Sequence, residues 1–357
     1  MPERELKASI LGAMPGTDPL ETARTVLGEL GDPHLPALAE LPQRGATYET
    51  LGRTVSLLDG LSADMQSYGW RLTDTPGKDF RAAVSGRNSD VGIFADVIGT
   101  MEERPSTLKI QLLGPLTLAA NLHLHLGEKA ISDPGALRDI SQSLALGTAE
   151  FVRNVRRATG VSSVVVMVSE PHADAALAGA IPTVSGYRTL RAVKPADALR
   201  LWTDLVGEIK DDDAASVVLN LADHEGRLGQ AHSEAMGRVK EIDADGWYVN
   251  AVKHQSSMRA WESVAALIEA DRDVWLGAFD EASVASQVAG QKPESVAATF
   301  DRIVSPWRSV GLSFEQLHQT VLVPTSGLER LSPEHARRAL GRLTDLVDAG
   351  RQRIVDA

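Results

Sequence analysis

Short apolar runs alternate with long amphipathic stretches along almost the whole chain, and this alternation limits the folds that it can adopt. Eight runs have the length and composition of β-strands. They are Ala8–Leu11, Asp64–Leu72, Leu108–Leu112, Ser162–Val168, Ser216–Leu221, Trp247–Asn250, Val274–Ala278 and Thr320–Val323. Runs that are apolar throughout, such as Ser162–Val168, are typical of parallel strands that are covered on both faces.

Helical patterns occupy the intervals between these runs. They span Pro19–Leu30, Ala46–Leu61, Asp133–Thr159, Pro195–Ile209, a short stretch before Ile242, Ser256–Ala270, Pro293–Val310 and Ser332–Val355. The segment Thr73–Arg87 is rich in turn-forming residues and predicts a long surface loop. Strand followed by helix, repeated about eight times, predicts an α/β fold, a single (β/α)8 TIM barrel domain over residues 1–357. A doubly wound sheet is the alternative, but no Gly-rich phosphate loop follows an early strand.

Composition narrows the classes of function. The chain has no cysteine, and its 36 Lys and Arg against 48 Asp and Glu give a net charge of −12. This acidic balance argues against a nucleic-acid-binding protein, which normally has a basic face. The absence of cysteine excludes disulfides, thiolate metal ligands and a cysteine nucleophile. With neither a signal-peptide pattern nor a long uncharged apolar window, we expect a cytoplasmic protein without a membrane partner.

The residues that follow the strands are the candidates for chemistry, because barrel enzymes place their active sites at the carboxyl ends of the strands. Glu170 directly follows a strand, where a carboxylate can hold a substrate ammonium group or act as a base. Backbone amides or an arginine in the barrel mouth are its alternative partners. His172 on the next loop is a candidate ligand or base, and Asp280 follows the seventh strand.

Two further groups of residues have the chemistry of metal ligands. Asp223, His224 and Glu225 follow the fifth strand and combine with Glu170 into a possible replacement metal site. The alternative is a polar loop at the start of a helix, where acidic residues are favoured. His123-x-His125 resembles the metal pair of amidohydrolase barrels, but we expect it in a helix, where residues two apart diverge.

Several strand ends resemble the barrel of cobalamin-independent methionine synthase, and more closely its shorter single-barrel relatives. ILGAMPGT resembles the first-strand signature, Ile-Gly-Ser followed by an aromatic residue and Pro. LKIQLLGPLTLAANL resembles the Gly-Pro-x-Thr motif of the third strand, and VVVMVSEP resembles a strand that ends in Asp-Glu-Pro. VLVPTSGL resembles the last strand, which ends in Pro-Asp-Cys-Gly-Leu. HLPALAELPQRG and YGWRLTDTPGKDFRAA resemble the short relatives in particular.

The resemblance implies methyl transfer from a methylated folate to the thiol of homocysteine, with a zinc ion that activates the thiol. It implies zinc ligands near four positions, where the family has a His, two Cys and a Glu. These positions fall near Leu219, Leu221, Asn250 and Ser326, none of which is a strong zinc ligand. We therefore expect no cofactor.

The resemblance also implies contacts with the substrate and the folate. The implied substrate-binding positions are Leu11, Gly12, Ala13, Ser169 and Glu170. Ala13 stands where the family has Ser, and Ser169 where it has Asp. Asn121 and Ala282 fall near the family's folate-stacking aromatic residue and its proton-donating His.

These observations favour a diverged, zinc-free member of the family that binds a small amino acid, thiol or pterin (folate) at the barrel mouth. One alternative is an active methyltransferase with a replaced metal site built from Glu170, Asp223 and His224. Another is a non-catalytic scaffold or partner-binding protein, since fold alone does not decide function.

Overall fold

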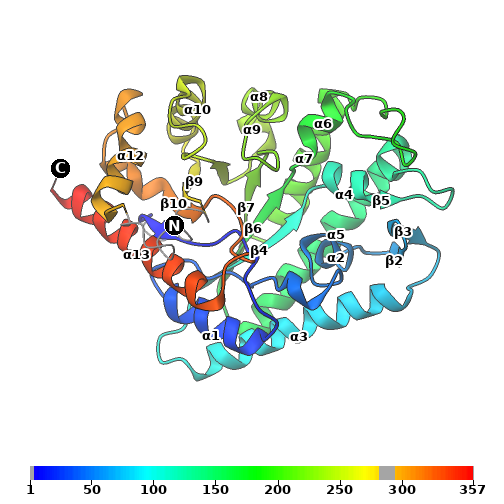
Figure 1. The fold of residues 1–357 in the computed structure, drawn as a ribbon, viewed down its shortest axis with the longest axis horizontal. Helices are drawn as coiled ribbons and strands as arrows, with labels where there is room; N and C mark the ends of the chain where they lie inside the picture. The colour runs from blue at the N-terminus through cyan, green and yellow to red at the C-terminus, as the bar shows by residue number, and fades with distance from the viewer. Residues whose placement is uncertain (1–3, 281–293, 357) are drawn as a thin grey trace.

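A seven-stranded sheet forms the centre of the molecule in a computed structural model that describes residues 4–280 and 294–356 (Figure 1). Its order is β1-β10-β9-β8-β7-β6-β4, and every neighbouring pair is parallel. The strands are β1 (Lys7–Ala8), β4 (Thr107–Leu113), β6 (Ser163–Ser169), β7 (Ala215–Asn220), β8 (Gly246–Val249), β9 (Asp273–Phe279) and β10 (Thr320–Pro324). The sheet forms a half-barrel in an α/β fold, as the alternation of strands and helices predicts.

Helices surround the outside of this sheet (Figure 1). They are α1 (Pro19–Glu29), α2 (Thr50–Val55), α3 (Lys78–Thr100), α4 (Pro115–Asn121), α5 (Pro134–Thr159), α6 (Ala173–Leu177), α7 (Pro195–Lys210), α8 (Gln230–Met236), α9 (Val239–Ile242), α10 (Met258–Glu269), α12 (Val296–Ser309) and α13 (Pro333–Val355). The described residues also form the 3-10 helices η1 (Pro42–Arg44), η2 (Ala130–Ser132) and η3 (Glu315–Gln319). Among the helices that the structure describes, none combines the length and apolarity needed to cross a membrane.

Apolar side chains form two clusters, one on each side of the sheet. The larger cluster fills the space between sheet and helices. The smaller, here called the inner cluster, lies on the other face and consists of Leu11, Leu35, Met167, Val218, Ala222, Tyr248, Trp275, Val321 and Val323. Because side chains alternate between the faces of a strand, the inner cluster shows which residues of β6, β7, β8, β9 and β10 point into the half-barrel. All six tryptophans are buried, as expected for core residues.

The prediction of a barrel strand at Asp64–Leu72 is wrong. That stretch forms an antiparallel hairpin, β2 (Ser62–Gln66) and β3 (Gly69–Thr73), which joins β5 (Leu122–His123) in a separate three-stranded sheet. Gly69 has φ +126°, a conformation that favours glycine and allows the chain to reverse. Alternating polarity is common to all half-buried strands, so it does not distinguish a hairpin from a barrel strand.

Two predictions near this hairpin also need correction. The expected loop Thr73–Arg87 is helical from Lys78, because Phe80, Ala83 and later apolar residues form one buried face of α3. Its turn-forming residues lie before the helix, and the Asp64 carboxylate accepts the Asp79 backbone N–H at 2.8 Å. The expected helix Ala46–Leu61 is shortened to the single short helix α2.

The stretch 35–40 connects the two edge strands of the sheet. The Leu35 N–H donates to the carbonyl of Ala8 beside β1 at 2.9 Å, and the Leu38 N–H donates to the carbonyl of Lys109 in β4 at 2.8 Å. Parallel bridges join this stretch to the chain on both sides. It therefore supplies backbone partners to both edges, although its sequence, with Pro36 inside it, has no strand pattern.

Candidate functional site

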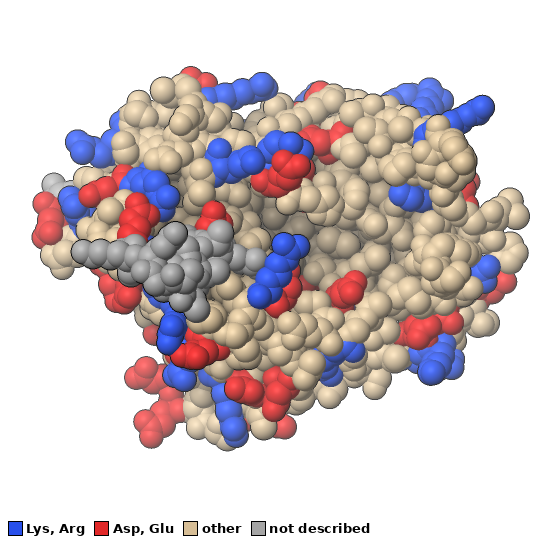
Figure 2. Space-filling model, viewed as in Figure 1, with Lys and Arg blue, Asp and Glu red and all other residues tan. Residues whose placement is uncertain are grey.

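Small polar side chains project into the half-barrel at the carboxyl ends of four strands. Three of them lie two residues beyond a member of the inner cluster and therefore on the same face. The fourth, Thr325, lies 3.1 Å from the position that a Cβ on inward-facing Gly277 would take. They are Ser169, Asn220, Asn250 and Thr325, here called the strand-end set. The face of the molecule drawn in Figure 2 is hollowed near its middle, with charged side chains on part of the rim. The strand-end set contains two hydroxyls and two amides and no ionisable group.

Neighbouring residues hold this set in place. Asn220 Oδ1 accepts the Ala222 N–H at 3.1 Å, and Asn250 Oδ1 accepts the Lys253 N–H at 2.9 Å. Neither amide NH₂ has an acceptor among the described residues, which leaves four N–H bonds to donate. Gly277 of β9 is needed here, since a Cβ on it would lie 2.8 Å from the Tyr248 hydroxyl.

Glu170 is turned into the protein rather than toward a ligand. Its side chain is 1% exposed. Oε1 accepts the Leu116 N–H and the Trp202 Nε1–H, both at 3.0 Å, and Oε2 accepts the Thr117 N–H at 2.7 Å. Burial raises the pKa of Glu170, and these hydrogen bonds oppose the rise. The carboxylate thus joins the first turn of α4 to α7. Of the two alternative partners that the sequence suggested, backbone amides or an arginine, the structure shows backbone amides.

His172 and His224 come together from two different loops. Their Nε2 atoms lie 3.4 Å apart, and the rings meet edge to face with centroids 4.6 Å apart. Burial, followed by the charges of His224 and Lys129, lowers the pKa of His172 to about 4. Two neutral imidazoles share one N–H in this arrangement, so protonating both would place two positive charges in contact.

This pair predicts an unusual titration. We expect the ring protons of His172 to titrate near pH 4 in proton NMR spectra, well below the usual 6.5 for histidine. Because the unfolded chain binds this proton below about pH 6.5, the free energy of unfolding falls as the pH drops from 6.5 to 4. His224→Asn should raise the pKa of His172 only in part, since burial is the larger cause. A midpoint near 6.5 in the parent protein would contradict a half-buried His172 in contact with His224.

The other candidate metal ligands do not join this pair. Burial alone would raise the pKa of Asp223, but hydrogen bonds from Arg227 and Glu225 lower it overall, and Arg227 Nε lies 2.7 Å from Asp223 Oδ2. The Asp223 carboxylate therefore stabilises the turn 223–227 in which it lies. Asp280 is exposed at the end of β9, and Ala282 lies outside the described residues. Within residues 4–280 and 294–356, no three His, Asp or Glu side chains are placed to hold one metal ion.

The positions near which the resemblance implies zinc ligands are only partly inside the half-barrel. Leu219 and Leu221 belong to the cluster between sheet and helices, so they point away from the inner face. Asn220, which lies between them, is the residue of this strand end that points inward. Asn250 does face inward, and Ser326 is exposed beyond β10. Side-chain amides and a neutral hydroxyl are poor ligands for zinc. The residues present at these positions therefore do not fit a zinc ion.

The remaining candidates occupy varied positions. Leu11 belongs to the inner cluster, and Gly12 has φ +122° with its Cα facing Gln111. The carbonyl of Ala13 accepts the Leu328 N–H at 2.8 Å. Asn121 donates its side-chain NH₂ to the carbonyl of Thr117 at 2.8 Å.

His123 lies in β5 rather than in the expected helix. Its Nδ1 is 3.0 Å from the carbonyl of Gly127, and its ring meets Tyr68 edge to face. His125 is exposed on the following turn. The His123 ring is therefore engaged in contacts with Gly127 and Tyr68.

Lys109 is a buried charge that the sequence pattern did not single out. It lies in β4 with no exposed surface, and its Nζ donates to Gln111 Oε1 at 3.3 Å. Burial lowers the pKa of Lys109 to about 7, although the nearby Glu40 raises it. A single lysine in the apolar run Leu108–Leu112 was the available signal.

Lys109 should make the free energy of unfolding depend on pH between about 7 and 10. Its pKa is about 7 in the folded state and about 10.5 in the unfolded chain, so the unfolded chain holds the proton over this range. We expect the free energy of unfolding to rise as the pH increases from 7 toward 10, as measured by urea titration. Lys109→Met should flatten that rise. An unchanged pH profile in the variant would argue against a buried, titrating lysine.

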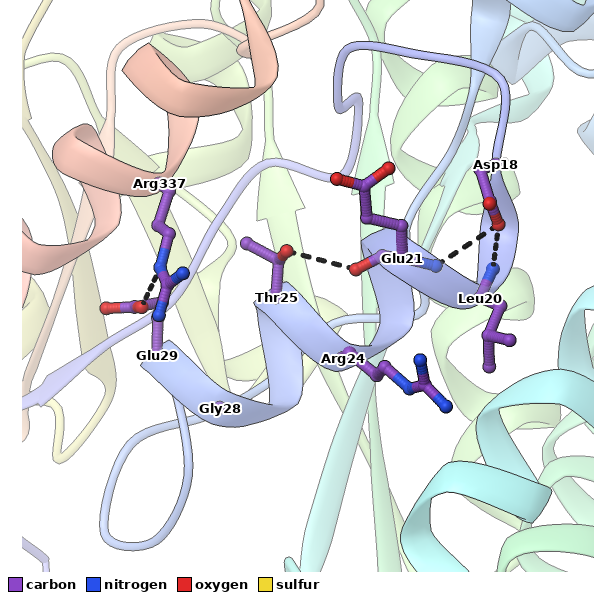
Figure 3. Close-up of a pocket in the computed structure, with 8 residues that line it drawn as sticks. All are labelled: Asp18, Leu20, Glu21, Arg24, Thr25, Gly28, Glu29 and Arg337. Atoms are coloured by element: carbon purple, nitrogen blue, oxygen red, sulfur yellow. Dashed lines mark hydrogen bonds and ion pairs between the residues drawn. The ribbon is translucent and has the colours of Figure 1, made fainter.

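A second depression lies on the outer face of α1 (Figure 3). It has a volume of about 370 Å³ and extends to Arg337 of α13. Arg337 pairs with Glu29 at 2.6 Å, and Asp18 accepts backbone N–H groups of the first turn of α1. These contacts cap α1 and join it to α13, so they account for much of the polar surface seen there.

Comparisons with known proteins support the fold. No family model matches the sequence, and no curated protein matches it. Among solved structures, the chain is similar to a B12-independent methionine synthase from Shewanella sp. W3-18-1 in complex with selenomethionine. The TM-score is 0.64 at 11% sequence identity, covering 99% of this chain and 100% of that chain. At this identity the likeness shows the fold alone, an α/β fold like that of this barrel enzyme.

Proposed function

We propose that the chain is a diverged, zinc-free relative of the methionine-synthase barrel that binds a small amino acid, thiol or pterin at its strand ends. The strand-end set carries this proposal. In a fold that matches along the full length of the relative, these positions hold hydroxyls and amides. Such groups bind a polar ligand through hydrogen bonds, but they do not lower the pKa of a thiol as a metal ion does.

The chemistry of the set supports a small polar ligand. An amide side chain presents donors and an acceptor together, so Asn220 and Asn250 can address a carboxylate or the hydrogen-bonding edge of a pterin ring. A few convergent polar groups above an apolar floor are typical of ligand sites, and the inner cluster supplies that floor. In this proposal Glu170, whose carboxylate is held by α4 and Trp202, does not contact the ligand.

The proposal includes a closed barrel. Stretch 35–40 takes the place of the second barrel strand between β1 and β4, so residues 1–357 form one closed barrel domain. The backbone hydrogen bonds to both edge strands support this closure. The protein acts in the cytoplasm on a small molecule.

Thermal melting and metal analysis test the function. We expect the purified protein to lack stoichiometric zinc, and at least one of methionine, homocysteine or 5-methyltetrahydrofolate to raise the Tm, because a ligand of the native state stabilises it. Asn250→Leu should abolish that rise, whereas Gly207→Ala on the exposed side of α7 should retain it. Stoichiometric zinc would contradict the zinc-free site. The absence of any ligand effect would favour the non-catalytic scaffold.

A further inference from the structure

A pocket of about 330 Å³ lies between the first turns of α5 and α7, apart from the strand-end set. Residues of η2 and of the segment 191–194 complete its wall. Its floor is apolar, with Ile131, Leu137 and Leu201 each less than 10% exposed. The volume lies within the range of small-molecule sites, which begins at about 300 Å³.

Positive charge dominates the rim of this pocket. Four cationic side chains line it, against the single carboxylate of Asp197; they are Arg138, Arg191, Lys194 and Arg200. This local excess stands out in a chain whose net charge is −12. The pocket is therefore complementary to an anion, while the protein as a whole is not.

Two of the four cations are free to bind. Arg138 pairs with Asp139 at 2.9 Å, and Arg200 pairs with Asp197 at 3.3 Å. Arg191 and Lys194 have no ion pair among the residues that the structure describes, and both are exposed. Arginine and lysine next to an apolar floor suit a ligand with an anionic head and an apolar body.

We propose that this pocket binds a small amphipathic anion, whose apolar body contacts Leu137 and Leu201 and whose carboxylate or phosphate head pairs with Arg191 and Lys194. The ligand and its site differ from those of the proposed function. The two proposals therefore stand or fall separately, and Asn250→Leu should leave binding at this pocket unchanged.

Binding of simple probes to the full chain tests the proposal by isothermal titration calorimetry. Hydrocinnamate and phenyl phosphate carry the two possible heads, and neutral hydrocinnamamide carries neither. We expect binding of at least one anion in preference to the amide, and the preferred anion identifies the head. Arg191→Glu combined with Lys194→Glu should weaken that binding by about tenfold or more, because charge-assisted pairs are lost and repulsion replaces them.

Two controls separate a built site from general attraction. Arg157→Glu makes a charge change in the last turn of α5, roughly 30 Å along the helix from Arg138, and should leave the affinity unchanged. Ala192→Trp fills the pocket without altering charge and should also weaken binding. Equal binding of the amide, equal loss in Arg157→Glu, or absence of binding by folded protein would each overturn the proposal.

Discussion

Gly147→Ala is expected to destabilise the protein by roughly 3–5 kcal/mol, because it introduces atoms into a backbone contact that has no room for them. Gly147 lies on the buried face of α5, and a Cβ there would be 1.6 Å from the Leu57 carbonyl oxygen. The contact is fixed from both sides, since the Asp59 N–H donates to the Ser143 carbonyl at 3.2 Å and Ser143 Oγ donates to the Asp59 carbonyl at 2.7 Å. Neither backbone can withdraw without losing hydrogen bonds.

Urea denaturation followed by circular dichroism measures this loss. Gly207→Ala is the matched control, since Gly207 also lies inside a helix but has no heavy atom within 4 Å of the position that a Cβ would take. That change should stabilise the protein by about 0.5–1 kcal/mol, because alanine loses less conformational freedom on folding. If Gly147→Ala were as stable as the parent, α5 would not pack on the 57–59 turn.

Glu170→Gln is expected to lower the free energy of unfolding by about 2–4 kcal/mol, because a buried hydrogen-bond network loses acceptors. The carboxylate serves three donors, two from the first turn of α4 and one from Trp202. An amide has a single oxygen, and its NH₂ would face another N–H donor. Gly114→Ala should weaken the same network, since a Cβ there would lie 2.5 Å from Glu170 Oε1.

This result distinguishes a structural carboxylate from a substrate-binding one. Glu208→Gln removes a carboxylate on the exposed side of α7 and should change stability little. Should Glu170→Gln melt like the parent protein but lose a ligand-induced rise in Tm, Glu170 would contact the ligand directly. The burial of its side chain and its three donors predict the opposite pattern, a loss of stability in the absence of any ligand.

Strands β6, β9 and β10 could be located from the sequence because they are apolar runs that helices cover on one side and the inner cluster on the other. Helix α5 could be located from Asp133, which caps its first turn. The β2–β3 hairpin and the stretch 35–40 could not be located in this way. Alternation looks the same in any half-buried strand, and hydrogen bonds from two distant neighbours leave no trace in local sequence.

The candidate site was predicted in part for a similar reason. Ser169 and Asn250 were reached as strand ends, but Asn220 was missed in favour of its outward neighbours Leu219 and Leu221. A shift of one residue moves every side chain of a strand to the opposite face, and strand boundaries from sequence are not that accurate. His172 and His224 were both selected for a replacement polar site with Asp223 and Asp280, but nothing in the sequence shows that the two imidazole rings meet.

The sequence by itself determined the α/β class, the order of most strands and helices, and the absence of any thiolate, because these depend on residue type and local periodicity. Only the tertiary structure decided which strand-end side chains face inward, that Glu170 is bound by α4 and Trp202, and that two histidines from separate loops touch. The physical reason is that strand register and burial arise from contacts between segments distant in sequence, and these contacts place each side chain either at the strand ends or in the core.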